Sequence, residues 1–205
     1  MENPGRHPAD TAHFETIYAR HEDPWGTLQR PYEREKFADT LAMIPTERVS
    51  SAFEVGCGVG ALTELLAPRC ESLLAVDCSP SAVRRARIRC GSLPQVDLQV
   101  MRVPEDLPDR AQFDLVVLSE VCYYLSPAEL STTIATVTCS LRPGGHVLLV
   151  HWQHGSAEHK LSGEEVHEAF IAAPGLRRIE GRTVTRYGNT YRTDLLQRRA
   201  RPPLR

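Results

Sequence analysis

The chain has 205 residues, which is enough for one filled core and short for two domains. Its 24 Lys and Arg residues against 26 Asp and Glu residues give a formal charge of −2, which argues against a dedicated nucleic-acid binder. No apolar run approaches the ~20 residues of a membrane span, and the first residues lack the pattern of a secretion signal. We therefore expect one cytoplasmic domain, a monomer or homodimer, that binds neither membranes nor nucleic acid.

The six cysteines form no C-x-x-C motif, and their spacing fits no zinc template. In a cytosolic chain, thiols stay reduced and are mostly buried. We therefore expect neither disulfides nor a metal site from Cys57, Cys70, Cys78, Cys90, Cys122 and Cys139.

The first 46 residues lie outside the expected core. Residues 1–12 are rich in Pro, Gly and small polar residues, and we expect them to be flexible. Residues 13–46 show two helical patterns split by the turn-forming segment Asp23-Pro24-Trp25-Gly26, and the second helix is expected near 31–43. Closing an active site requires apolar groups that exclude water, so we expect this segment to form a helical lid. Its large aromatic residues are Tyr18, Trp25 and Tyr32.

Residues 51–198 show a different pattern, in which short apolar runs alternate with helical stretches. The expected strands are 52–55, 72–76, 96–100, 113–118 and 146–150, and the expected helices lie near 60–67, 80–90 and 127–141. Runs of Val and Leu without polar alternation are typical of strands buried on both faces, and this order predicts a parallel, doubly wound α/β sheet. The last two runs alternate around Gly188-Asn189, which predicts a hairpin and an antiparallel finish.

The strongest chemical signal is the loop Glu54-Val-Gly56-Cys-Gly58-Val-Gly60, which ends the first strand and opens a helix. Glycines there permit a tight turn and let a ligand press against the main chain. Asp77 ends the second strand, where a carboxylate can accept hydrogen bonds from both hydroxyls of a ribose. The pattern predicts an adenosine-containing ligand.

Two such ligands compete for this loop. Gly56-x-Gly58-x-x-Ala61 fits the dinucleotide fingerprint and would indicate an NAD(P)-dependent oxidoreductase. Against this, Glu54 would place a negative charge near a pyrophosphate, the third glycine falls at 60, and the antiparallel finish is unlike a plain nucleotide half-domain. S-adenosylmethionine, which has an amino group and no phosphate, suits Glu54 better.

Together with the glycine loop, Val76-Asp77 and residues 113–125 and 141–147 resemble the ordered motifs of class I S-adenosylmethionine-dependent methyltransferases. The resemblance extends over about residues 13–198 and is closest to the nodulation N-methyltransferase (NodS-like) family, whose amino-terminal pattern is similar to the segment 23–36. It implies a Rossmann-like, mostly parallel sheet of seven strands with an antiparallel last strand and helices on both faces. It also implies methylation of a small molecule, with an amine on a sugar or specialised metabolite as the favoured acceptor.

The same resemblance implies roles on the cofactor side. The methionine and ribose part of S-adenosylmethionine would lie against Gly56, Gly58 and Gly60, with Glu54 oriented toward its amino group. Asp77 would hold the ribose hydroxyls, and Cys78 and Ser79 would flank the adenine. Many members carry an acid after the third strand, but this chain has Met101-Arg102-Val103-Pro104-Glu105 there, so the adenine contact falls to the backbone of Arg102 and Val103 or to Glu105. Ser119 would lie under the transferable methyl group, and Tyr18 and Trp25 of the lid would touch the cofactor.

On the acceptor side, candidates for catalysis follow the fourth and fifth strands: Glu120, Tyr123, Tyr124, His151, Trp152 and His154. His151 has the right chemistry for a base, or it simply ends a strand and bonds a carbonyl. Glu120 would pair with a cationic amine or cap the next helix, and Tyr124 would line the acceptor pocket or pack. Methylation of oxygen, sulfur or carbon, an NAD(P) oxidoreductase and a non-catalytic cofactor-binding protein remain alternatives.

Overall fold

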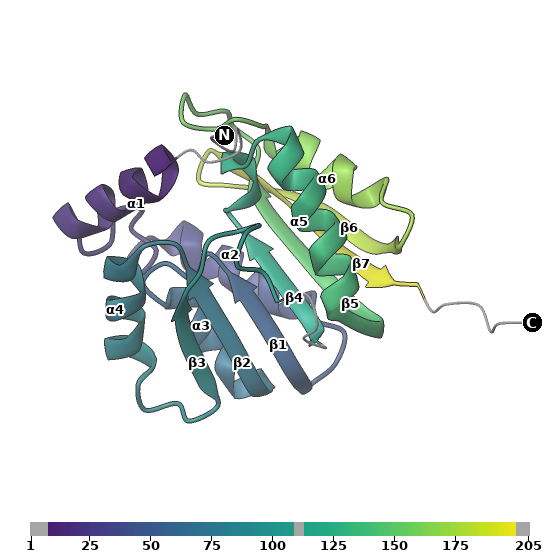
Figure 1. Ribbon diagram of the computed structural model, residues 1–205, viewed down its shortest axis with the longest axis horizontal. Helices are drawn as coiled ribbons and strands as arrows, with labels where there is room; N and C mark the ends of the chain where they lie inside the picture. The colour runs from purple at the N-terminus through teal and green to yellow at the C-terminus, as the bar shows by residue number, and fades with distance from the viewer. Residues whose placement is uncertain (1–7, 109–112, 200–205) are drawn as a thin grey trace, which may run out of the picture.

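The computed structural model describes residues 8–108 and 113–199, which fold around a seven-stranded sheet flanked by helices (Figure 1). The strand order is β3-β2-β1-β4-β5-β7-β6, and β7 runs antiparallel to both of its neighbours. The strands are β1 (Val49–Val55), β2 (Cys70–Asp77), β3 (Val96–Val100), β4 (Phe113–Ser119), β5 (Leu141–Trp152), β6 (Leu176–Arg186) and β7 (Asn189–Arg198). The expected α/β class and antiparallel finish are thus confirmed.

The α-helices are α1 (Pro8–Arg20), α2 (Pro31–Ala42), α3 (Ala61–Leu66), α4 (Pro80–Cys90), α5 (Pro127–Ser140) and α6 (Gly163–Ile171), with 3-10 turns η1 (Ala67–Arg69) and η2 (Cys122–Tyr124). Helix α1 begins inside the stretch expected to be flexible, of which residues 1–7 lie outside the described residues. Helix α6 was not predicted, although its capping box is readable: Ser162 Oγ accepts from the Glu165 N–H, and Glu165 accepts from the Ser162 N–H.

Both faces of the sheet are buried, as the uninterrupted apolar strands predict. Ala52 of β1 packs into a core with side chains of α2 and α3, whereas its neighbour Phe53 packs into a second core with α5 and α6. Helix α4 covers β2 and β3 through Val83 and Ala86. The carboxyl ends of the parallel strands therefore remain the place where a ligand can enter.

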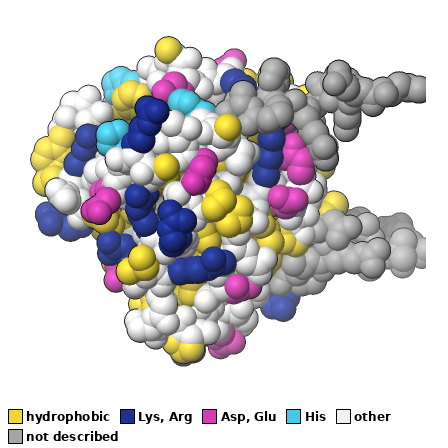
Figure 2. All heavy atoms as spheres, turned by 60° about the vertical axis from the view of Figure 1, so that its left-hand side comes forward, with side chains coloured by type: hydrophobic (Ala, Val, Ile, Leu, Met, Phe, Trp, Pro, Cys, Tyr) yellow, Lys and Arg dark blue, Asp and Glu magenta, His cyan; other side chains and the backbone are white. Residues whose placement is uncertain are grey.

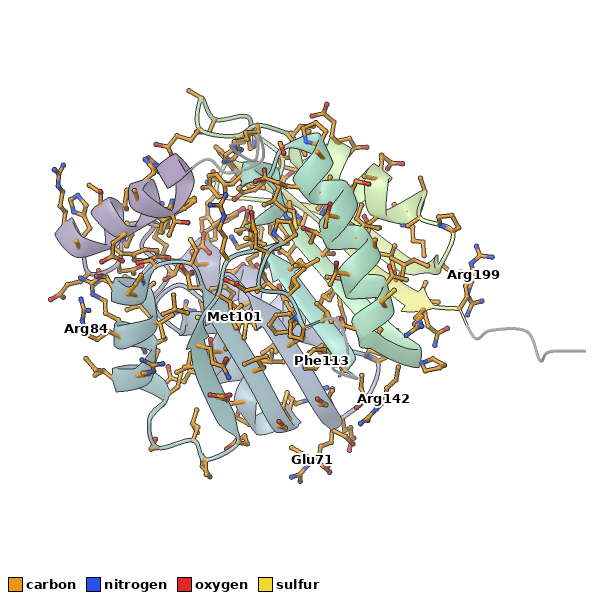
Figure 3. All side chains as sticks on the ribbon, viewed as in Figure 1. Glu71, Arg84, Met101, Phe113, Arg142 and Arg199 are labelled. Carbon is orange, nitrogen blue, oxygen red and sulfur yellow. The ribbon has the colours of Figure 1, made fainter. Side chains whose placement is uncertain are left out.

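Figure 3 shows the two ends of the sheet. Glu71 and Arg142, near the starts of β2 and β5, lie at the edge of the molecule away from α1, whereas Met101, which follows β3, lies in the interior. Helix α1 lies beyond the carboxyl ends of the strands (Figure 1). Among the described residues, no helix has both the length and the apolar character to cross a membrane. All six cysteines are free thiols, four of them buried.

The final hairpin turns one residue earlier than expected. Arg186 pairs with Asn189, so the two turn residues are Tyr187 and Gly188 rather than Gly188 and Asn189. Both have positive φ, 52° and 74°, as a type I′ turn requires. Tyr187 is an unusual residue in this conformation, and its hydroxyl donates to Glu35 Oε1 of α2 at 2.6 Å.

The hairpin tip is therefore tied to the second helix of the chain. Arg186 forms ion pairs with Glu35 and with Asp39, the latter at 2.9 Å. The Tyr191 hydroxyl also donates to Asp39. These contacts fix α2 against the sheet although the partners are more than 140 residues apart in sequence.

Candidate active site

A cavity of about 480 Å³ opens at the carboxyl ends of the central strands, a size typical of small-molecule sites. Of the predicted site residues, the glycine loop and β2 contribute Glu54, Gly56, Gly58, Asp77 and Cys78. The lid contributes Tyr18 and Trp25, and the segment after β3 contributes Arg102 and Val103. The end of β4 and the η2 turn contribute Ser119, Glu120 and Tyr124. The structure thus brings these twelve predicted residues together around one cavity. Five other predicted residues do not line it: Gly60, Ser79, Glu105, His151 and His154.

The lid is held down by a carboxylate that sequence reasoning missed. Glu15 of α1 accepts hydrogen bonds from Ser79 Oγ at 2.6 Å and from the Ser81 N–H at 3.0 Å and hydroxyl at 2.6 Å. These bonds, led by those from the Ser79 and Ser81 hydroxyls, lower the pKa of Glu15. Because Ser79 caps α4 next to Asp77, these bonds hold α1 beside the predicted ribose site.

Two arginines of α4 donate to main-chain carbonyls of neighbouring elements. Arg85 donates to the Tyr18 carbonyl of α1, and Arg87 Nη2 donates to the Leu98 carbonyl of β3 at 2.7 Å. On the face that includes α1 and α4, Lys and Arg side chains are interspersed with acidic and hydrophobic ones (Figure 2). Arg84 points outward from α4 (Figure 3).

The Asp77 carboxylate holds the glycine loop through a hydrogen bond. Its Oδ2 accepts from the Gly58 N–H at 3.0 Å and its Oδ1 from the Ser79 N–H at 2.9 Å. Burial raises the pKa of Asp77 to about 6 despite these bonds. Gly58 has φ +54°, and a Cβ there would lie 2.8 Å from the Tyr18 hydroxyl, so only glycine lets the lid meet the loop.

Glu54 is a buried carboxylate at the cavity wall. The side chain is buried, and no described residue donates a hydrogen bond to its Oε2. Burial raises the pKa of Glu54 to about 7, and the negative charge of Asp77 adds to the effect. A buried carboxylate oxygen without a donor is costly, so this pair of acids fits a ligand that brings a diol and an ammonium group.

Only some of the residues predicted to contact the adenine line the cavity. Cys78, Arg102 and Val103 line the cavity, but Ser79 and Glu105 do not. Ser79 is fully buried as the N-cap of α4, and Glu105 forms an ion pair with Arg102 at 3.3 Å. Of the two predicted adenine contacts after β3, only the segment of Arg102 and Val103 lines the cavity, and Glu105 does not.

Gly60 was predicted to contact the cofactor, but it does not line the cavity. It is the left-handed N-cap of α3, with φ +82°, and a Cβ there would lie 3.1 Å from the Ala86 Cα of α4. The glycine that suggested a ligand contact instead lets α3 pack closely on α4.

We expect Gly60→Ala to destabilise the fold by about 1–3 kcal/mol, because it combines backbone strain with a clash against a helix backbone. Urea unfolding measures this loss. The affinity of the folded variant for S-adenosylhomocysteine should stay close to that of the wild type, and a large drop in affinity without a loss of stability would restore Gly60 to the binding site.

On the acceptor side, the cavity holds a buried ion cluster of Glu33, Lys36 and Glu120. Lys36 Nζ lies 2.9 Å from Glu33 Oε2 and 2.7 Å from Glu120 Oε1, and the lysine side chain is 3% exposed. Burial opposes the charge of Lys36, but the two carboxylates outweigh it and raise the pKa of the lysine. Burial raises the pKa of Glu33, whereas Lys36 overcomes the same effect at Glu120 and holds its pKa low.

Glu120 occupies a strained position directly after β4. Its φ is +56°, which is uncommon for a residue with a side chain. Glu120 Oε2 accepts from the Tyr123 hydroxyl at 2.7 Å and from the Trp152 N–H at 3.0 Å. The carboxylate is thus held ionised and fixed in direction.

The predicted base His151 is not in the cavity. Strand β5 continues through Trp152, two residues beyond its expected end, so His151 still lies inside the sheet and is fully buried. The residue accepts the Cys122 N–H and contacts His167 instead. His154, another candidate, is exposed and accepts the Thr190 N–H at 3.1 Å.

A different histidine lines the cavity. The His159 ring stacks on Tyr123 with 3.8 Å between centroids, and burial lowers the pKa of the imidazole. Tyr124 completes this wall, edge-on to Phe14 of the lid at 4.8 Å. His159 was missed because it lies in an irregular loop, where neither a strand end nor a motif marks it.

The cavity as a whole is acidic. Its lining contains three basic side chains, Arg30, Lys36 and Arg102, against seven carboxylates. The carboxylates are Asp23, Glu33, Glu54, Asp77, Glu120, Glu129 and Glu158. Such a lining attracts cations and disfavours a pyrophosphate.

Comparison with known proteins agrees with this geometry. Nodulation protein S from Rhizobium tropici is 36% identical over 129 residues, which cover 62% of this chain and 54% of that protein. Nodulation protein S from Bradyrhizobium diazoefficiens is 37% identical over 129 residues, which cover 60% and 59%. This chain thus spans little more than half the length of these curated relatives.

The solved structure of N-methyltransferase NodS from Bradyrhizobium japonicum WM9 in complex with S-adenosyl-L-homocysteine matches with a TM-score of 0.81. The identity is 26%, and the match covers 92% of this chain and 97% of that chain. The fold is therefore that of class I methyltransferases. The sequence profile of nodulation protein S (NodS) matches residues 15–186, a stretch that runs from the lid to the final hairpin. Because this match takes in both sides of the cavity, the chain belongs to the NodS family.

Proposed function

We propose that the protein is an S-adenosylmethionine-dependent methyltransferase that methylates an amine of a small molecule, on a sugar or specialised metabolite of the cytoplasm. The observation that carries this proposal is a single cavity that joins the Glu54 and Asp77 carboxylates to the Glu33–Lys36–Glu120 cluster. Membership of the NodS family and the acidic lining support it.

The cofactor side of the cavity has the donors and acceptors that this ligand needs. Asp77 can accept hydrogen bonds from the ribose hydroxyls, and its Oδ2 already holds the glycine loop through the Gly58 N–H. The orphan Oε2 of Glu54 fits the ammonium group of the methionine part. When bound, S-adenosylmethionine supplies an electrophilic methyl group on a positively charged sulfur.

The acceptor side would bind an amine in its charged form and then remove one proton. Glu120 is ionised and fixed by Tyr123 and Trp152, so it can hold an ammonium group in one direction. An amine is a nucleophile only when neutral, and His159, whose pKa burial lowers, can accept its proton. His159 and Glu120 both contact Tyr123, so the two side chains lie on one wall of the cavity, which supports these proposed roles.

The lid supplies the third requirement, exclusion of water. Phe14, Tyr18 and Trp25 form an aromatic cluster, with Tyr18 and Trp25 edge-on at 5.1 Å, over the cofactor side. Tyr18 is 6% exposed, so the closed lid already shields the loop. A dry site strengthens the electrostatic contacts of both acids.

Isothermal titration calorimetry with S-adenosylhomocysteine and with NADH tests the cofactor. We expect S-adenosylhomocysteine to bind at least about 100-fold more tightly, because NADH brings a pyrophosphate into an acidic cavity. A panel of small amines and alcohols, including amino sugars, then tests the acceptor by mass spectrometry. Binding of NADH alone, or turnover of alcohols but not amines, would contradict the proposal.

A further inference from the structure

Behind the acceptor wall, four buried polar groups form a continuous hydrogen-bonded chain. The Cys122 N–H donates to His151 Nε2 at 3.2 Å, and His151 Nδ1 lies 3.1 Å from His167 Nε2. His167 Nδ1 lies 2.6 Å from Asp194 Oδ2. His151, His167 and Asp194 are each 0% exposed, and they belong to β5, α6 and β7.

The direction of each hydrogen bond in this row of groups is fixed at the Asp194 end. Arg178 and Arg192 donate to the Asp194 carboxylate, the latter from Nε at 2.6 Å, so Asp194 is ionised and can only accept. His167 must therefore donate from Nδ1 and accept at Nε2. His151 must in turn donate from Nδ1, which leaves its Nε2 free to accept the backbone N–H of Cys122.

This arrangement tolerates neither a different tautomer nor a second proton. A proton on His151 Nε2 would face the Cys122 N–H, and a proton on His167 Nε2 would face the His151 N–H. Burial lowers the pKa of both histidines, in agreement with two neutral rings. These hydrogen-bonded groups thus form a fully satisfied buried network, and such a network specifies one geometry.

At its near end, the network holds the η2 turn. Cys122 is the first residue of this turn, and Tyr123 follows it. The Tyr123 hydroxyl donates to Glu120 Oε2, its ring stacks on His159, and its carbonyl accepts from the Lys160 and Leu161 N–H groups. The direction of Glu120 and the position of the His159 loop therefore both depend on how η2 is placed.

We propose that His151, oriented by His167 and Asp194, is a positioning residue that fixes the η2 turn and thereby aims Glu120 and His159 at the acceptor. The inference rests on the proposed function for the role of the acceptor wall, whereas the positioning itself is a property of the chain. His151 does not line the cavity, and it contacts the cavity wall through the Cys122 N–H and the Tyr123 ring.

Two variants of one position separate geometry from packing. His151→Phe keeps an aromatic ring but removes the acceptor for the Cys122 N–H. His151→Gln keeps an amide oxygen that can accept and an amide N–H that can donate. His146→Phe, on the same strand but outside the cavity lining, is the matched control.

For methyl transfer, we expect His151→Phe to lower kcat by at least about tenfold and to change the affinity for S-adenosylhomocysteine by less than about twofold. His151→Gln should recover most of kcat, and His146→Phe should match the wild type. Equal kcat for the Phe variant and the wild type, or equal losses in both His151 variants, would overturn the inference.

A measurement without turnover keeps this test separate from the proposed function. In ¹⁵N-histidine spectra of the wild type, His151 and His167 should both carry the proton on Nδ1 from pH 6 to 8. Exchange of the Cys122 amide hydrogen should be at least about tenfold faster in His151→Phe and unchanged in His151→Gln. Protonated Nε2 in either ring, or unchanged exchange in the Phe variant, would refute the positioning role even if methyl transfer is established. If the wild type methylates no amine, the proposed function fails, and these spectra alone decide the role of His151.

Discussion

Glu120→Gln should reduce turnover of an amine acceptor by about 100-fold or more, the loss typical of removing a fixed charge from an active site. The amide has the size of the carboxylate and can still accept from the Trp152 N–H, but it offers no charge to an ammonium group. It also leaves Lys36 with Glu33 as its remaining carboxylate partner in the cluster. Steady-state kinetics with the best amine of the panel gives kcat and KM.

Two comparisons make this result specific. The affinity of Glu120→Gln for S-adenosylhomocysteine should change by less than about threefold, since Glu120 lies on the acceptor side of the cavity. Glu71→Gln is the matched control, because Glu71 is exposed at the opposite end of the sheet (Figure 3). Turnover of Glu120→Gln close to that of the wild type would remove Glu120 from the acceptor site.

The affinity for S-adenosylhomocysteine should fall on the order of 100-fold between pH 8 and pH 5.5. In the free protein, burial raises the pKa of Glu54 to about 7 and that of Asp77 to about 6. Binding requires both groups ionised, because Glu54 pairs with an ammonium and Asp77 accepts from hydroxyls. Protons therefore compete with the ligand, and each group weakens binding about tenfold per pH unit below its pKa.

Calorimetry at four pH values, in buffers of different ionisation enthalpy, measures both the affinity and the proton released on binding. Glu54→Gln should bind more weakly at pH 8 and lose most of the pH dependence between 8 and 6. Asp97→Asn, at an exposed position of the neighbouring strand β3, should follow the wild type. An affinity that stays constant, or rises, toward acid pH would contradict the assignment of both carboxylates to the ligand.

The cofactor side could be predicted from sequence because its determinants are local. The glycine loop and Asp77 each end a buried strand, and parallel neighbouring strands place such ends side by side. Gly60 shows the limit of this reasoning, since positive φ serves helix packing as readily as ligand binding. His151 shows another limit: two extra residues of pairing between β5 and β7 kept it inside the sheet.

The acceptor side could not be assembled from sequence. Lys36 and Glu120 are separated by 84 residues, and no periodicity links a helix of the lid to the end of β4. Glu15 and His159 likewise carry no motif, and their roles follow only from contacts across the fold. The resemblance to a family supplied the class of chemistry, but the charges that select an acceptor come from tertiary structure.

The contacts between the hairpin tip and α2 join residues that are synthesised far apart in time. Arg186 follows its partner Glu35 by 151 residues, which at about 5–20 residues per second is roughly 10–30 s of translation. Helix α2 carries Glu33 and Lys36, so the acceptor half of the cavity stays unfinished while the nascent chain already contains the whole cofactor half. We therefore expect a partly made chain to contain the glycine loop and Asp77 before its acceptor half is complete, because the hairpin contacts to α2 come last in synthesis.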